Sequence, residues 1–188
     1  NTIAWTPSQK LLVGGLFTNA GGNPDADYFA IFDPIANTWS APATPLNGAV
    51  NSIAVSAAGV AYLGGAFTGK VTAVNIAGNA WASMPALTGD VNVVAIDSTG
   101  NIFVGGAFTG FIKKYDATAV SWISISTDVT QTSYLGGAVT DLAFATDKLY
   151  VVGLYNGVAV LDRTADNWSW LGGAANPVGQ ARAISIDS

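Results

Sequence analysis

The sequence Gly-Gly-Ala-Phe-Thr at residues 64–68 is one copy of a pattern that recurs along the chain and decides its fold. The pattern reads Gly-Gly-Leu-Phe-Thr at residues 14–18 and Gly-Gly-Ala-Phe-Thr at residues 105–109, and a weaker copy, Val-Gly-Leu-Tyr-Asn, covers residues 152–156. The second glycine of each copy stands at position 15, 65, 106 or 153, which gives spacings of 50, 41 and 47 residues. Four-stranded propeller blades repeat with a period of about 40 to 50 residues. The period therefore predicts a β-propeller.

Four extended stretches fit within each copy. An apolar residue lies eleven or twelve positions before the second glycine and alternates with its neighbours, as in residues 51–56 and 93–97, which predicts a first strand. The second strand runs into the glycines, and short turns such as Thr99-Gly100 join the two strands as a hairpin. A third strand follows, and a fourth carries a tryptophan. We therefore expect antiparallel meanders of four strands.

A fixed spacing links the third and fourth strands. An Asp or Asn precedes a Trp by six residues in every copy; the pairs are Asp33 and Trp39, Asn75 and Trp81, Asp116 and Trp122, and Asp162 and Trp168. An Asx side chain at a turn accepts backbone N–H bonds two residues on, which tightens a hairpin. A large ring repeated once per blade fills the wedge between neighbouring blades. We expect the Asx residues in turns and the four indoles buried between blades.

The glycine pairs have two interpretations. Glycine lets backbone N–H groups approach an anion, which is the basis of phosphate-binding loops. Here, however, each pair ends a strand, and neither a helix nor a Lys-Ser/Thr pair follows. We therefore interpret the pairs as places of close packing between blades, with a β-bulge at the glycines.

These markers together predict an all-β protein, a β-propeller of four-stranded antiparallel blades. About four repeats are present, at residues 1–50, 51–91, 92–139 and 140–182, and residues 183–188 match the first strand of a fifth. Residues 1–188 then form a single propeller or part of one. We expect residues 183–187 to be extended and to open another blade, with the missing strands supplied by the same or another chain, because propellers avoid open sheet edges.

The residues quoted above resemble a known group of repeats. A glycine pair that closes the second strand, followed by Asp-x5-Trp across the third turn, is similar to kelch-type propeller repeats. The Gly-Gly-x-Phe-Thr form resembles the propeller repeats of large secreted or surface proteins, including fungal cortical polarity markers. The resemblance covers essentially the whole chain, with departures at Asn75 and Val152. It implies a propeller and leaves function open, because one fold hosts many functions.

The composition excludes several kinds of chemistry. The 188 residues contain no Cys and no His, which rules out thiolate or imidazole catalysis, disulfides and an ordinary zinc site. The 7 Lys and Arg residues are scattered along a chain of net charge -5, so no basic stripe is available for nucleic acid. No apolar run is long enough for a membrane-spanning helix. We therefore expect neither nucleic-acid binding nor membrane insertion.

Three aromatic residues outside the repeat pattern, Trp5, Tyr134 and Trp170, are the candidate ligand-binding residues. Aromatic rings offer a large apolar face, which suits stacking on a ligand, and burial in the core is the alternative. The tail of repeat three, residues 124–137, reads as an exposed loop. Such insertions on a repetitive scaffold are places for partner recognition, and a tolerated surface insertion is the alternative.

Repeat one carries an insertion before its third strand that contains Asn23, Asp25 and Asp27. Their alternating oxygens are candidate ligands for Ca²⁺, a hard cation that takes oxygen ligands. The chain has no Glu to supply a bidentate closing ligand, and Asx-rich turns in a solvated loop are the alternative. We expect no other cofactor.

Three functions are compatible with the sequence. The first is a non-catalytic propeller that serves as a structural or adhesive protein-interaction module on an extracellular, cell-surface or virion assembly; low charge and abundant Thr, Asn and Gly support it. The second is a lectin-like propeller that binds glycans. The third is a hydrolase that uses pairs of Asp residues. Because carboxylates that recur with the repeat have structural roles, we expect no enzyme, and we expect partners that are other proteins of an assembly or glycans.

Overall fold

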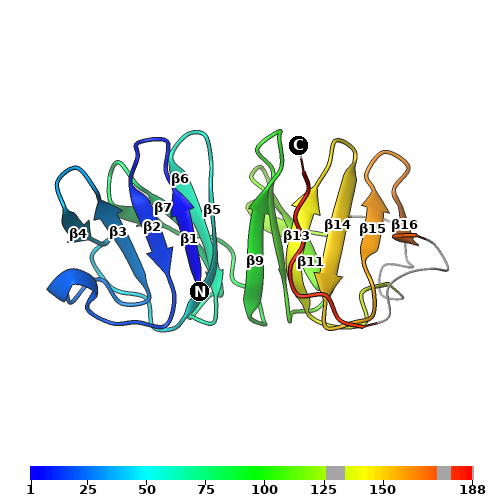
Figure 1. The fold of residues 1–188 in the computed structure, drawn as a ribbon, viewed down its shortest axis with the longest axis horizontal. Helices are drawn as coiled ribbons and strands as arrows, with labels where there is room; N and C mark the ends of the chain where they lie inside the picture. Colours follow the sequence, from blue (N-terminus) through cyan, green and yellow to red (C-terminus); the bar gives the residue numbers. More distant parts are fainter. Residues whose placement is uncertain (126–133, 173–178, 188) are drawn as a thin grey trace.

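The computed structural model describes residues 1–125, 134–172 and 179–187. These residues form four sheets of four strands each, and every sheet is an antiparallel meander in chain order (Figure 1). We number the sheets as blades 1 to 4. Blade 1 contains β1 (Thr2–Trp5), β2 (Leu11–Gly14), β3 (Phe29–Asp33) and β4 (Thr38–Ser40). Blade 2 contains β5 (Val50–Val55), β6 (Val60–Gly65), β7 (Val71–Asn75) and β8 (Ala80–Ala82).

Blades 3 and 4 repeat this arrangement. Blade 3 contains β9 (Val91–Ile96), β10 (Ile102–Gly106), β11 (Ile112–Asp116) and β12 (Ser121–Ile123). Blade 4 contains β13 (Val139–Phe144), β14 (Lys148–Gly153), β15 (Ala159–Asp162) and β16 (Asn167–Trp170). The first strands β1, β5, β9 and β13 contact one another in succession, and the hydrophobic core lies between the blades. The expected all-β propeller architecture is confirmed.

The insertion of repeat one forms η1 (Ala20–Gly22), a short 3-10 turn, and Tyr134 is also assigned as helical. This turn packs on the tryptophan of its own blade, because a Cβ on Gly21 would lie 2.3 Å from Cδ1 of Trp39. Gly21 also has a φ of 62°, which a side chain rarely tolerates. Nothing in the described part of the chain is a helix of the length and hydropathy needed to cross a membrane.

The first glycine of each pair is where one blade approaches the next. A Cβ on Gly14, Gly64 or Gly105 would lie 2.6, 2.3 or 2.5 Å from a valine Cγ1 of the following blade. Those valines are Val50, Val91 and Val139, the first residues of β5, β9 and β13. The sheet register shifts next to the glycine pair in blades 2, 3 and 4. The expected close packing is therefore found at all three glycines, and the expected bulge is found in blades 2, 3 and 4 but not in blade 1.

Blade 4 exchanges the sizes of the two residues at this contact. Val152 stands where the other blades have the first glycine, and Ala181 stands where the next blade would begin with valine. Both backbone carbonyls accept the hydroxyl of Thr140, each at 3.3 Å, so the two residues lie side by side. The larger residue of the pair therefore stands on blade 4, and the smaller one stands on the following segment.

Residues 181–187 run beside β13 (Figure 1) and make the contacts that a following blade makes elsewhere. Thr140 Oγ1 donates to the carbonyl of Ala181 as Asn51 Nδ2 donates to that of Val91, at 3.3 and 3.0 Å. The backbone N–H of Ile184 donates to Asp141 Oδ2 at 2.9 Å. No strand is assigned to residues 181–187, so the expected fifth blade stays a prediction.

The turns between third and fourth strands have the structure that the Asx spacing predicts. Oδ1 of the Asx residue accepts the backbone N–H groups two and three residues further on, at 2.8 to 3.2 Å in all four blades. The fifth residue of each turn is left-handed, with φ between 47° and 53°. These residues are Asn37, Asn79, Val120 and Asp166. The recurring Asx side chains are therefore bound to their own turns.

Candidate functional site: clefts between the blades

Two equivalent clefts open at the joints between blades 1 and 2 and between blades 2 and 3. Each is lined by a fourth-strand tryptophan, by the loop that enters the blade and by the Phe-Thr of the repeat. Cleft 1, beside Trp81, has a volume of about 390 Å³, and cleft 2, beside Trp122, has one of about 400 Å³. The two positions differ by one repeat, so the fold itself generates both clefts.

A hydrogen bond fixes the indole in each cleft. Trp81 Nε1 donates to the carbonyl of Thr44 at 3.0 Å, and Trp122 Nε1 donates to the carbonyl of Pro85 at 2.7 Å. Both carbonyls belong to the loop that precedes the first strand of the tryptophan's own blade. Neither indole is fully buried, and Trp81 also packs on Phe29 with 5.6 Å between ring centroids. Each ring is thus oriented by its edge while part of its surface stays accessible.

The loop beside cleft 1 is held in place by side-chain contacts. Asn47 Nδ2 donates to Thr68 Oγ1 at 2.7 Å, and Asn47 Oδ1 accepts the backbone N–H of Thr68 at 2.9 Å. Thr44 has a φ of 71°, which is rare for a β-branched residue. Strained backbone of this kind persists only where the surroundings fix it, and it is concentrated at functional sites. Cleft 1 is therefore preformed.

The two clefts differ in charge. The residues that line cleft 1 carry no charged side chain; its apolar wall includes Leu46, Phe67 and Met84, and its rim carries the Thr72 hydroxyl. Cleft 2 has Lys113 where cleft 1 has Thr72. Neither cleft contains a carboxylate, and Lys113 of cleft 2 is the only titratable side chain among their lining residues.

The joint between blades 3 and 4 is packed with aromatic rings instead. Tyr134 stacks on Trp168 with 6.5 Å between ring centroids and 22° between ring planes, and it packs against Trp170 at 5.2 Å. Tyr155 approaches Trp170 at 6.4 Å, and burial raises the pKa of its hydroxyl. Trp168 is consequently only 5% exposed.

The four repeated tryptophans thus differ in burial, although all were expected to be buried between blades. Trp168 is buried, Trp81 and Trp122 are half-buried, and Trp39 is 37% exposed. Trp39 stacks at 4.9 Å on Phe32 of its own blade and is approached by the insertion of repeat one. The expectation of buried indoles therefore holds fully only where extra aromatic rings fill the joint.

The structure brings together two of the three predicted ligand-binding aromatics. Tyr134 and Trp170 meet at the joint between blades 3 and 4. Trp5 lies at the end of β1, is 59% exposed, and lines a separate cavity of about 330 Å³ with Thr6, Gln9 and Pro34. The three residues therefore do not form one site, and ligand binding at each stays a prediction. Residues 126–133 of the predicted recognition loop lie outside the described residues.

Two of the three predicted calcium ligands, Asn23 and Asp27, accept hydrogen bonds from the backbone of their own loop. Asn23 Oδ1 accepts the N–H of Asp25 at 3.0 Å, and Asp27 Oδ1 accepts the N–H of Asn19 at 2.8 Å. Across residues 1–125, 134–172 and 179–187, no group of three or more acidic side chains is placed to hold a metal. Calcium binding at this loop stays a prediction.

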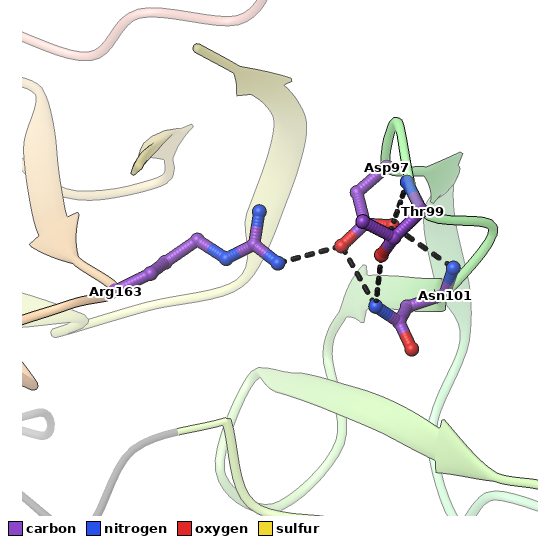
Figure 2. Close-up of polar contacts among 4 residues, drawn as sticks. All are labelled: Asp97, Thr99, Asn101 and Arg163. Carbon is purple, nitrogen blue, oxygen red and sulfur yellow. Dashed lines mark hydrogen bonds and ion pairs between the residues drawn. The ribbon is translucent and has the colours of Figure 1, made fainter. Parts of the chain in front are cut away.

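The most fully bonded carboxylate joins blades 3 and 4 (Figure 2). Asp97 follows β9, and its side chain is 1% exposed. Its Oδ1 accepts the N–H and hydroxyl of Thr99 and the N–H of Asn101, at 3.0, 2.7 and 2.9 Å. Its Oδ2 accepts Asn101 Nδ2 at 3.0 Å and Arg163 Nη2 at 2.6 Å.

Arg163 reaches Asp97 from the turn after β15. Its guanidinium carbon lies 5.6 Å from the ring centroid of Phe103 and 5.4 Å from that of Phe144, which come from different blades. Burial by itself raises the pKa of Asp97, but the hydrogen bonds from Asn101, Thr99 and Arg163 outweigh it and hold the pKa well below its usual range. This ion pair is a structural clamp, because a carboxylate that stays ionised and fully bonded is a poor proton carrier.

Asp97 and Asp187 occupy equivalent positions in the repeat, and this equivalence alone does not indicate the clamp. A signal was available, because the equivalent positions in blades 1 and 2 are Thr6 and Ser56, whose hydroxyls close the same hairpin turn. Only blade 3 places a charge there, and only blade 4 follows its turn Asp with an Arg. The partnership itself joins residues 66 positions apart, which sequence spacing does not reveal.

Replacing Trp81 with alanine is expected to lower the free energy of unfolding by about 2 kcal/mol, which is below the usual cost for a buried tryptophan because the ring is half-buried. Urea denaturation measures the change. Trp81→Phe serves as the control and should lose about 1 kcal/mol, since it keeps a ring against Phe29 and loses the bond to Thr44. Equal stability of Trp81→Ala and the parent would show that the ring does not support the joint.

Comparison with known proteins bears on the fold. No family model matches the sequence, and no curated protein matches it. Among solved structures, the chain is similar to U3-55K (9% identity, TM-score 0.64, 96% of this chain and 54% of that one) and to the WD40 repeats of RRP9 (10%, 0.65, 96% and 54%). The computationally designed Ika8 protein matches over 100% of this chain and 52% of its own, at 13% identity and a TM-score of 0.65. The chain spans about half the length of these structures and shares the fold of WD40-type β-propellers.

Proposed function

We propose that this protein is a non-catalytic propeller scaffold that binds other proteins of an assembly. One observation carries the proposal: the polar groups that recur with the repeat are bonded within the blades, whereas neutral or basic clefts recur at the surface between them. A scaffold of this kind presents equivalent surfaces at regular intervals, which suits partner binding better than catalysis.

The carboxylates support a non-catalytic role. Asp33, Asp116 and Asp162 each accept two backbone N–H bonds in their turns, and Asp97 is clamped by Arg163. The pKa of Asp33 is lowered chiefly by the N–H of Ala36, and that of Asp162 chiefly by the N–H of Ala165. A hydrolase needs one carboxyl group with a raised pKa next to another that is ionised. These side chains are arranged for the opposite effect.

The assembly and its location follow as parts of the same proposal. The match to about half of each solved structure, and the placement of residues 181–187 against blade 4, support further blades from the same or another chain. Low charge and the absence of oxidisable Cys support an extracellular, cell-surface or virion location. The kelch-like form of the repeat is part of the same proposal.

A lectin-like role is the second candidate, and the clefts favour it for one reason. Each cleft combines an oriented indole with hydroxyl groups, and such a pair suits a neutral sugar. Binding on a glycan array would support this candidate. Glycan binding without any protein partner would weaken the protein-scaffold proposal.

Site-specific photo-crosslinking tests the proposed function. A photoreactive residue at Ser83, on the rim of cleft 1, is expected to join a defined protein in material from the native source. The matched control carries the same residue at Ile35, which is 87% exposed in the turn after β3, and should join none. Glycan-array binding without a protein cross-link at Ser83 would contradict the proposal.

A further inference from the structure

We propose that clefts 1 and 2 each accept a tyrosine side chain from a segment of a protein partner, with its ring stacked on Trp81 or Trp122. This inference rests on the proposed function and adds the chemistry by which the partner is recognised. The two clefts have similar volumes, about 390 and 400 Å³, and each contains an indole whose orientation is set by a loop carbonyl.

The third joint of the same molecule supplies the template. Tyr134 lies five residues before Val139, the first residue of β13. Pro45 holds this place before β5, and Ala86 holds it before β9. At the third joint the phenol ring stacks on Trp168, at 6.5 Å and 22°. At the other two joints a small or cyclic aliphatic residue leaves the equivalent indole without that ring.

Burial of the tryptophans agrees with this comparison. Trp168, on which Tyr134 stacks, is 5% exposed, whereas Trp81 and Trp122 are half-buried beside open clefts. The joint between blades 3 and 4 thus accommodates an aromatic ring from the segment that precedes β13. A partner's ring in cleft 1 or 2 would complete the same packing, with an offset stacked geometry favourable for aromatic pairs.

The lining of the clefts favours tyrosine over a charged group. Cleft 1 has an apolar wall at Leu46 and Met84 and a hydroxyl at Thr72. A ring that is apolar on its face and polar at its tip matches this combination. In cleft 2 the tip would meet Lys113, whose ammonium donates to a phenol oxygen. Neither lining contains a carboxylate to attract a cationic residue.

Nuclear magnetic resonance of the indole N–H groups tests the inference on the intact chain. The probe is the capped peptide Ser-Tyr-Leu-Gly, which copies residues 133–136, and the control peptide is capped Ser-Ala-Leu-Gly. We expect the tyrosine peptide to shift the Nε1–H signals of Trp81 and Trp122 saturably in the millimolar range, as befits a single anchoring ring. The Trp168 signal and the alanine peptide should show no such response.

Filling one cleft provides the matched variants. Pro45→Tyr places a ring where blade 4 has Tyr134, so it should weaken the peptide's binding at Trp81 at least about fivefold and leave Trp122 responsive. Pro45→Ala copies cleft 2 and should retain binding, which separates loss of the proline from gain of the ring. Ile35→Tyr adds a tyrosine far from both clefts and should change neither signal. Unchanged circular dichroism of each variant shows that the blades are intact.

Three results of the peptide titrations would overturn the inference. They are equal shifts with the alanine peptide, unchanged binding in Pro45→Tyr, and stronger shifts at Trp81 with methyl glycosides than with the tyrosine peptide. A protein partner that still cross-links at Ser83 in the double variant Pro45→Tyr, Ala86→Tyr would refute the tyrosine anchor while the proposed scaffold function stood. If the parent chain itself formed no cross-link to any protein, the scaffold function would be refuted instead.

Discussion

Replacing Asp97 with alanine is expected to lower the free energy of unfolding by about 3 kcal/mol at neutral pH. The side chain is 1% exposed and accepts five hydrogen bonds, so its removal leaves the groups of Thr99, Asn101 and Arg163 without their acceptor. Arg163 is 27% exposed and regains some water, which keeps the loss at the lower end for a broken buried pair. Urea denaturation of both proteins measures the difference.

The same substitution should change how stability depends on pH. The pKa of Asp97 is lower in the folded protein than in the unfolded chain, so its contribution is fully present above about pH 5 and is lost as the pH falls below about 4. The parent should therefore lose up to about 1.4 kcal/mol more per pH unit than Asp97→Ala in that range. Asp33 and Asp162 also have lowered pKa values, but they are present in both proteins and drop out of the comparison.

Asp116→Ala is the matched control for this experiment. Asp116 accepts two backbone N–H bonds in an exposed turn and bridges no blades, so its removal should cost about 1 kcal/mol or less. Two results would show that the clamp between blades 3 and 4 does not stabilise the protein. One is that Asp97→Ala is no more destabilising than Asp116→Ala, and the other is that the stability of the parent and of Asp97→Ala depends on pH in the same way.

Gly105→Val is expected to destabilise the protein by about 3 kcal/mol, because the new side chain would meet Val139 Cγ1 already at its Cβ, 2.5 Å away. Gly105 and Val139 both lie on buried strands, so neither strand can move far to relieve the contact. Combining Gly105→Val with Val139→Ala copies the arrangement of Val152 and Ala181 and should recover more than half of the loss. Unfolding of the parent, both single variants and the double variant measures the coupling.

The outcome of this cycle separates two explanations of the glycine. If the double variant is as unstable as the sum of the single variants, Gly105 is required for its backbone conformation, and the size exchange in blade 4 has another cause. Gly100→Val is the control for backbone strain without a steric clash. A Cβ at Gly100 meets nothing within 4 Å, so the cost of this substitution comes from the φ of 86°.

The repeat made the fold predictable from sequence. The glycine pairs, the alternating first strands and the Asx-to-Trp spacing each recur, and each corresponds to one local structure: a bulge at a joint, an inner strand or a hairpin turn. These features depend on residues close in the chain, so their spacing carries the structural information. The size of the clefts could not be predicted in this way, because it depends on loops of two different blades.

The candidate site was harder to predict for a physical reason. Tyr134 and Trp170 were identified by being outside the repeat, and the structure places them together, but the decisive difference lies at Pro45 and Ala86, whose small side chains leave a ring uncovered. A cleft produced by missing bulk leaves no conspicuous residue in the sequence. The clamp at Asp97 was missed because it joins an acidic and a basic residue that lie 66 positions apart in the sequence, on different blades.

The exchange of sizes at Val152 and Ala181 has a consequence for how repeats find their neighbours during folding. Similar repeats in one chain are prone to misassembly, in which a blade docks on the wrong successor or on the same repeat of another molecule. Blade 4 has Val152 in its second strand, where the other blades have glycine, so we expect a following segment that begins with valine to collide with it and one that begins with alanine to fit. The contact therefore specifies the order of repeats: a chain in which repeat four was moved ahead of repeat three would bring Val152 against Val91, and it should fold slowly or aggregate although every repeat in it is native.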